Sequence, residues 1–172
     1  MSSSSRQKRR ESKKWFESLN KCTLVLVPCK AGMLWGIYQD NRLVQQHCEE
    51  AKTLDALASL WAGLQGRFSI ENICYARGPG SLSALKLLHI FVHTLAVVRG
   101  VGVFATDSFY FNHARPIHAF GNQFFIKESS GIKLEALPHL SAEVGGEVAL
   151  PQELILAHFN QELEPLYVCP PV

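Results

Sequence analysis

The sequence predicts an α/β protein with a mixed sheet and helices on its faces. β-rich apolar runs at 22–27, 32–39 and 42–48 follow one another with only short turns between them. Apolar residues at helical spacing then fill 54–64 and 82–98, and these segments alternate with β-rich runs at 73–76 and 101–105. Three antiparallel strands followed by alternating helices and strands (βββαβα order, then a further strand) are typical of such a mixed sheet.

Composition agrees with one soluble chain that is long enough for a real core. Of 172 residues, 47% are hydrophobic and 19% charged, which argues against general disorder. The five cysteines contain no CxxC pair, which favours reduced thiols in a cytoplasmic protein. The apolar run from Leu82 to Val98 is interrupted by Lys86, His89 and His93, and no signal peptide precedes the first strand. We expect a cytoplasmic protein with no membrane span.

Three parts are expected along the chain. Residues 1–20 form a flexible leader in which six basic residues lie within the first fourteen. A solvated extension is the favoured interpretation of this leader, and contact with RNA is the alternative. Residues 21–112 form a first lobe, and residues 113–172 form a reduced second lobe.

The first lobe begins with the three-strand meander. Cys22–Val27 reads as a strand buried on both faces, Gly32–Gln39 follows a Lys-Ala-Gly turn, and Asp40-Asn41 turns the chain into Arg42–Cys48. Thr53 is expected to cap the next helix, and Gly66 to stop it. Ile73–Ala76 is the fourth strand.

The next element is the turn Gly78-Pro79-Gly80-Ser81. Pro79 fixes φ, the two glycines permit unusual backbone angles, and Ser81 is placed as the N-cap of a helix that reaches Arg99. Such a strand–turn–helix unit suits an anion site at the helix N-terminus or a plain connection. No Walker pattern follows, so no phosphate-binding lysine is expected.

The second lobe is expected to contain a hairpin at 117–126 that turns at Gly121-Asn122, and a strand at 131–137. Pro151 is well placed in the first turn of a further helix that would run to about Phe159.

Candidate chemical groups are few. His89 and His93 have a spacing that suits one metal ion, but neither an HExxH glutamate nor a third ligand is evident, so a polar stripe with Lys86 is favoured. Cys29 and Cys74 lack any local sign of an activated thiol. Asp107 follows the fifth strand, where it would bind a ligand or cap the next turn. We therefore expect no catalytic residue, no metal and no cofactor.

The long helix is apolar nearly all round, which favours a helix covered by a partner protein. The predicted interface comprises Leu82, Leu85, Lys86, Leu88, His89, Val92 and His93.

The segment Gly78-Pro79-Gly80-Ser81-Leu82-Ser83-Ala84-Leu85-Lys86-Leu87-Leu88 resembles the motif GPGSFTGLRIG of the bacterial TsaB (YeaZ) family. The βββα lead-in, the run VGVFATDSF, the segment 119–127 and the final Pro-Leu-Tyr-Val are also similar to that family. The resemblance implies an ASKHA fold (actin-like ATPase, ribonuclease-H-like) and a role in making threonylcarbamoyladenosine in tRNA. It implies a non-catalytic partner of TsaD, bound through first-lobe helices, with the ATPase TsaE joining the pair, tRNA engaged indirectly, and a homodimer through the same surface.

Two departures from the family bear on function. Pro28 and Cys29 stand where the family's first strand carries an aspartate, which argues against magnesium-dependent catalysis. Ser83-Ala84-Leu85-Lys86 replaces the family's Thr-Gly-Leu-Arg, so the partner contact is expected to be reshaped. Two alternatives stay open: an ASKHA-type ATPase or metallopeptidase-like enzyme, and an RNA-binding module that uses the basic leader.

Overall fold

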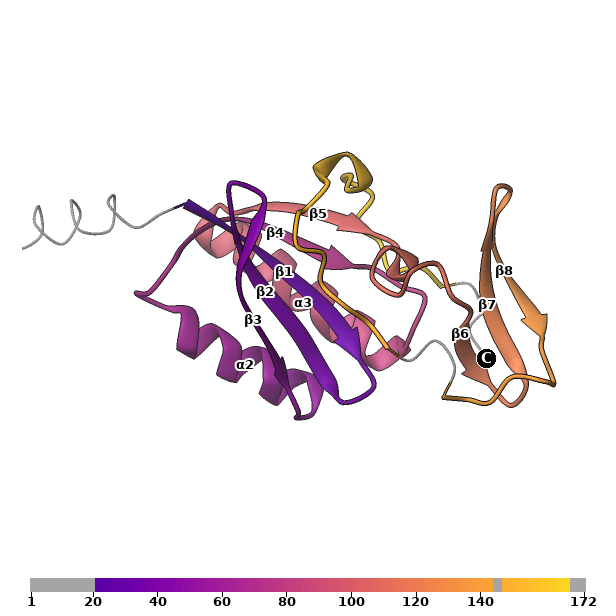
Figure 1. The fold of residues 1–172 in the computed structure, drawn as a ribbon. Coiled ribbons are helices and arrows are strands. Elements are labelled where there is room, and N and C mark those ends of the chain that lie inside the picture. The colour runs from indigo at the N-terminus through magenta and orange to yellow at the C-terminus, as the bar shows by residue number, and fades with distance from the viewer. Residues whose placement is uncertain (1–20, 144–146, 168–172) are drawn as a thin grey trace, which may run out of the picture.

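The computed structural model describes residues 21–143 and 147–167, and the predicted leader lies outside this range. The main sheet has the strand order β3-β2-β1-β4-β5 (Figure 1). Its strands are β1 (Lys21–Cys29), β2 (Gly32–Gln39), β3 (Arg42–Glu49), β4 (Ser69–Ala76) and β5 (Gly102–Thr106). β1, β2 and β3 form an antiparallel meander, whereas β4 pairs parallel with both β1 and β5. The sheet is therefore mixed, as predicted.

Two helices, α2 (Thr53–Leu64) and α3 (Leu82–Arg99), cover one face of the main sheet. Alternate side chains of β1 divide between the two faces, because successive side chains of a strand point to opposite sides. Leu24 and Leu26 pack in the core under the helices, while Val25 and Val27 belong to a second core on the other face. Both faces of the sheet are thus buried, as the continuous apolar run in β1 predicts.

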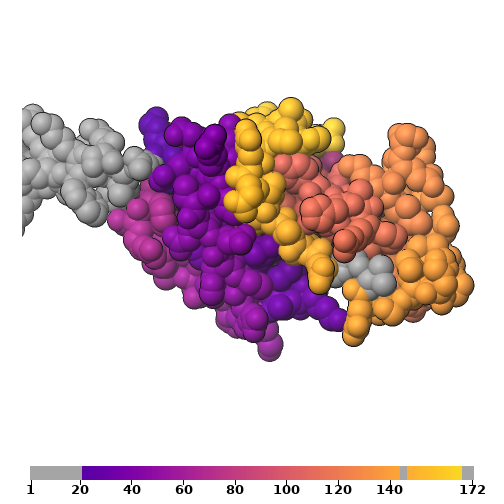
Figure 2. All heavy atoms as spheres, viewed as in Figure 1, coloured from indigo at the N-terminus to yellow at the C-terminus, as the bar shows by residue number. Residues whose placement is uncertain are grey.

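The second core is covered by an extended segment and not by helices. Residues 147–167 cross the sheet from β3 to β5, and Figure 2 shows this yellow segment lying across the strands. Glu153 bridges Arg42 at one edge of the sheet, and Asn160 bridges Ala105 at the other. Three buried side chains on this segment fill the second core: Leu150, Leu154 and Phe159. We call residues 147–167 the strap.

The strap overturns the helix expected from Pro151. Leu154 donates its backbone N–H to Asn41 O (2.7 Å), and Gln152 O accepts from Leu43 N (3.0 Å). A helix needs these same groups for its own ladder, so pairing with the meander excludes it. The described part of the strap has only a 3-10 turn, η2 (Leu156–His158).

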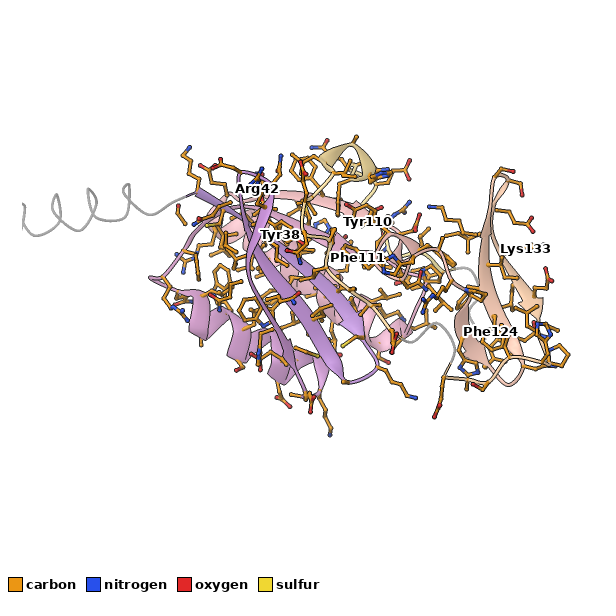
Figure 3. All side chains as sticks on the ribbon, in the orientation of Figure 1. Tyr38, Arg42, Tyr110, Phe111, Phe124 and Lys133 are labelled. Carbon is orange, nitrogen blue, oxygen red and sulfur yellow. The ribbon has the colours of Figure 1, made fainter. Side chains whose placement is uncertain are left out.

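Two tyrosine hydroxyls, one from β2 and one from the loop after β5, also form hydrogen bonds with the strap. Figure 3 labels Tyr38 and Tyr110 beside it. Tyr38 donates its hydroxyl to Pro151 O (2.7 Å), and Ile155 donates its N–H to the Tyr110 hydroxyl (3.2 Å). The C-terminal part of the predicted second lobe is therefore built into the first lobe.

The remaining strands form a small antiparallel sheet of order β6-β7-β8: β6 (Ile117–Phe120), β7 (Gln123–Glu128) and β8 (Gly131–Ala136). The hairpin turns at Gly121-Asn122, as predicted, and Gly121 has the positive φ (54°) that such a turn favours. Phe124 and Phe125 are buried in this sheet. An ion pair between Lys127 and Asp107 links it to the loop after β5.

One further expectation about helix ends is wrong. Thr53 is the first residue of α2 and not its cap, since the N-cap is Lys52, which makes no side-chain cap bond. Ser81, by contrast, is the N-cap of α3, and Gly100 ends α3 in the left-handed conformation (φ 67°).

Candidate functional site

The turn Gly78–Ser81 connects the carboxyl end of β4 to α3. Gly78 has φ of 118°, and the Gly78–Pro79 peptide is cis. A Cβ on Gly78 would lie 2.9 Å from Leu85 Cδ1 and 3.2 Å from Leu166 O, so this position has no room for a side chain. Ser81 Oγ accepts from Ala84 N at 3.5 Å. The turn is a closely packed corner from which α3 starts.

A pocket of about 280 Å³ lies beside this turn, at the carboxyl ends of β1 and β4. Ligands of open parallel sheets bind at such an edge. The lining residues are Pro28, Cys29, Lys30, Pro79, Gly80, Ser81, Ala84, Leu85, Ser108, Asn112, Ile117, His118, Ala142 and Val148. None of them carries a carboxylate, the usual protein ligand of magnesium.

Asp107, the nearest acid in sequence, has structural partners. Its Oδ1 accepts from Phe109 N (3.0 Å), which caps η1 (Ser108–Tyr110), and its Oδ2 pairs with Lys127. The capping role considered for Asp107 is confirmed. The pocket is therefore lined mainly by apolar and small residues, and its ionisable side chains are those of Cys29, Lys30 and His118.

The predicted interface residues lie on different faces of α3. Leu85, Leu88 and Val92 are buried, and Leu88 and Val92 belong to the main core. His89 and His93 are half-buried, and Leu82 and Lys86 are exposed. The three buried residues belong to the inner face of the helix, which packs on the sheet, so a partner cannot reach them while the core is closed.

The outer face of α3 carries three exposed apolar side chains that the sequence reasoning did not select. Ile90 is 62% exposed, Val97 86% and Val98 68%. We call Ile90, Val97 and Val98 the outer stripe. Because the helix is apolar nearly all round, its sequence alone does not show which side faces the sheet. The buried positions 84, 85, 88, 92 and 95 have helical spacing, but so do other apolar positions of α3, so the spacing does not single out the inner face.

His89 and His93 are adjacent, with ring centroids 4.2 Å apart. His89 Nδ1 lies 3.1 Å from Leu163 O, and the Tyr75 hydroxyl donates to the same carbonyl. His93 Nε2 is buried and has no hydrogen-bond partner within the described residues. Burial, and then the neighbouring His89, lowers the pKa of His93. The described residues contain no group of three side chains able to hold a metal ion, and this pair instead contacts the strap.

Two of the thiols, Cys48 and Cys74, are poorly suited to nucleophilic attack. Burial raises the pKa of Cys74 to about 12, and burial with the neighbouring Cys29 thiol raises the pKa of Cys48 to about 11. Cys29 Sγ lies 3.6 Å from Cys48 Sγ. Since the thiolate is the reactive form, Cys48 and Cys74 are held in the unreactive form near neutral pH.

α3 is also the one helix in the described part of the chain that is long and apolar enough to cross a bilayer, with a mean hydropathy of 1.5. A core helix of a soluble protein passes the same test, so this is weak evidence for a membrane span. The inner face of α3 packs on the main sheet.

Comparisons with known proteins bear on the fold. No model of a protein family matches the chain, and no curated protein matches it. Among solved structures, it resembles an uncharacterized protein with similarity to peptidase YeaZ from Pseudomonas aeruginosa, with a TM-score of 0.50, 15% identity, and coverage of 68% of this chain and 64% of that one. YeaZ from Pseudomonas aeruginosa matches with a TM-score of 0.49 and 15% identity, and the match covers 68% of this chain and 65% of that one.

The chain has a YeaZ-like fold. At 15% identity the likeness shows the fold alone, and the chain spans just under two thirds of the length of these structures.

Proposed function

We propose that the chain is a non-catalytic partner subunit in the TsaB manner. It binds TsaD and supports the transfer of threonylcarbamoyl to the adenosine next to the tRNA anticodon, in the cytoplasm. TsaE joins the larger complex, and tRNA is engaged indirectly. The observation that carries the proposal is the outer stripe of α3, which follows the GPGS turn in a YeaZ-like fold.

The outer stripe suits contact with a helix of another protein. A shallow groove of about 490 Å³ runs beside it, lined by His89, Ile90, His93, Thr94, Val97 and Val98. Burying apolar surface is worth roughly 25 cal/mol per Å², so covering three side chains that are more than half exposed favours association. The half-buried histidines lie at the edge of the stripe, where they add polar contacts.

The proposal also places the main sheet in the ASKHA class. An antiparallel meander followed by two parallel strands, with helices on one face, supports that assignment. The strap covers the other face, where a further helical layer would otherwise be needed to close the second core.

The enzyme alternative receives less support. An ATPase or metallopeptidase of this fold needs acidic side chains at the strand ends to hold a metal ion. At the end of β1 stand Pro28 and Cys29, and Asp107 is engaged in its cap and its ion pair.

Co-expression with TsaD from the same organism tests the proposal. A tagged chain is expected to retain TsaD through purification, and Val97→Glu is expected to reduce the retained TsaD at least tenfold by placing a charge in the stripe. Val44→Glu is the matched control, because Val44 is similarly exposed (51%) but lies on β3, away from α3. Loss of TsaD from neither variant, or from both equally, would contradict the proposed surface.

A further inference from the structure

One corner of the molecule lies where β1 and β4 begin, beside the carboxyl ends of α2 and α3 (Figure 1). Basic and aromatic side chains meet at this corner. We call Lys21, Trp61, Arg67, Phe68 and Arg99 the basic corner. Trp61 lies in the last turn of α2, Arg99 ends α3, and Arg67 and Phe68 immediately precede β4. Lys21 opens β1 and pairs in register with Ser69. Three segments that are distant in sequence, the start of β1, residues 61–68 and the end of α3, thus meet at one corner.

Two arginines of the basic corner lie over aromatic rings. The Arg99 guanidinium carbon is 5.9 Å from the centroid of the Trp61 ring, and that of Arg67 is 5.6 Å from the centroid of Phe68. Stacking restrains a guanidinium plane while its N–H groups stay available in that plane for bidentate contacts to an oxyanion. Both arginines are exposed.

Neither arginine has an acidic partner in the part of the chain that the structure describes. Within residues 21–143 and 147–167, no carboxylate forms an ion pair with Arg67 or Arg99. Lys21 pairs with Glu71 at 2.7 Å, so the five-residue corner and Glu71 together carry two uncompensated positive charges. This local excess contrasts with the rest of the chain, because residues 21–172 contain 11 basic and 13 acidic residues.

The sequence joins the leader to Lys21 of this corner. Six of the chain's 17 basic residues lie in residues 1–20, with only two acidic residues, and residue 20 is joined directly to Lys21. The sequence therefore attaches its most basic segment to the place where the described surface already has unpaired arginines. Since the opposite end of β1 leads to Cys29 and Lys30, the leader is attached far from the GPGS pocket.

The corner also has a hollow that suits a flat ring. A depression of about 410 Å³ is lined by Trp61, Leu64, Gln65, Gly66, Phe68, Ser69, Ile70 and Arg99. Trp61 and Phe68 are half-buried, and Trp61 is braced by an edge contact with Phe91 at 6.3 Å. Gln65 and Ser69 add polar groups at the rim.

We propose that the basic corner binds single-stranded nucleic acid. Arg67 and Arg99 contact phosphates, and one unpaired base enters the hollow against Trp61 or Phe68. Cationic grooves with aromatic stacking platforms are the general solution for single strands, because every base has a π-face. A duplex keeps its bases stacked inside and offers none to the hollow. The proposal concerns the isolated chain and does not depend on TsaD.

Fluorescence anisotropy with a labelled 12-nucleotide single strand tests this on the full chain, with RNA and DNA of one sequence as separate arms. Binding to either is expected, with weaker binding to the same sequence as a duplex. Arg67→Gln and Arg99→Gln are each expected to lower affinity about fivefold. Each is also expected to flatten the slope of log K against log salt by about 0.7, the value for one lost phosphate contact on a single strand. Trp61→Leu is expected to lower affinity about tenfold with an unchanged salt slope, since stacking carries no counterion term.

Arg115→Gln is the matched control, because Arg115 is an exposed arginine in the loop before β6, outside the basic corner. It is expected to change neither affinity nor slope. Circular dichroism melts check that each variant is folded. If Trp61→Leu does not fold, the affinities and salt slopes of the arginine variants decide the outcome. Full affinity in an Arg67→Gln/Arg99→Gln double variant would overturn the proposal, even if deletion of the leader abolishes binding. Absence of oligonucleotide binding at 50 mM salt would also overturn it, whether or not anionic lipid vesicles bind.

Discussion

Neighbouring residues of α3 have opposite structural roles. Leu88 is fully buried against the sheet, whereas Ile90, two positions along, is 62% exposed. Leu88→Ala is expected to lower the free energy of unfolding by about 2–5 kcal/mol, because it removes core contacts and leaves a cavity. Ile90→Ala is expected to change it by about 0.5 kcal/mol or less. Urea unfolding of both variants measures the difference, and equal costs would show that the helix is oriented differently.

The pKa of His93 gives a pH dependence with a definite sign. Burial and His89 lower the pKa of His93 in the folded state below its unfolded value of about 6.5. His89 opposes the charged form, and Glu164 of the strap, the other charged group acting on it, favours it. The unfolded chain therefore takes up more protons between the two values, so stability falls as pH drops through about 6.5 and levels off below the folded pKa.

The measurement is the melting temperature of the chain and of His93→Gln between pH 8 and pH 5. The chain is expected to lose more stability than the variant over this range, since glutamine does not titrate. A constant difference between the two melting temperatures at every pH would contradict the shift.

At the scale of elements, the strap covers the face of the main sheet that lies opposite the helices. Its three buried side chains, Leu150, Leu154 and Phe159, fill the second core. The ring of Phe159 also contacts the rings of Tyr110 and Phe111, with centroids 5.2 and 6.3 Å apart. Phe159→Ala is expected to lower the free energy of unfolding by about 3–5 kcal/mol. The exposed Leu156→Ala on the same segment is the control and is expected to be near neutral. Similar costs for both would mean that the strap is not anchored through Phe159.

The strap also shows where the sequence is insufficient. The meander, both helices, β4, β5 and the hairpin turn were predictable, because each has a local period and its own turn residues. Pro151 satisfies the local rule for a helix start, but Gln152 pairs with Leu43 of β3 and Leu154 with Asn41 of the β2–β3 turn, both more than a hundred residues earlier. These hydrogen bonds are tertiary contacts, so they leave no pattern in the local sequence. The basic corner was equally hidden, since it depends on the parallel pairing of Lys21 with Ser69.

At the scale of the whole molecule, the homodimer implied by the proposed function would cover the outer stripe with a second copy of the chain. Two copies of α3 related by a twofold axis would bury Ile90, Val97 and Val98 from each chain against one another. We expect a concentration-dependent dimer in sedimentation velocity. Val97→Glu is expected to weaken it at least tenfold, because the symmetry brings two like charges together.

TsaD and the second copy would compete for the same side chains, so added TsaD is expected to convert the homodimer into a one-to-one pair. Val44→Glu is expected to leave both assemblies unchanged, since Val44 lies on β3. A homodimer that persists in Val97→Glu, or that binds TsaD without dissociating, would show that α3 is not the shared surface. Because the variant at Val97 leaves the inner face intact, loss of both assemblies with an unchanged melting temperature identifies the outer stripe itself as the contact.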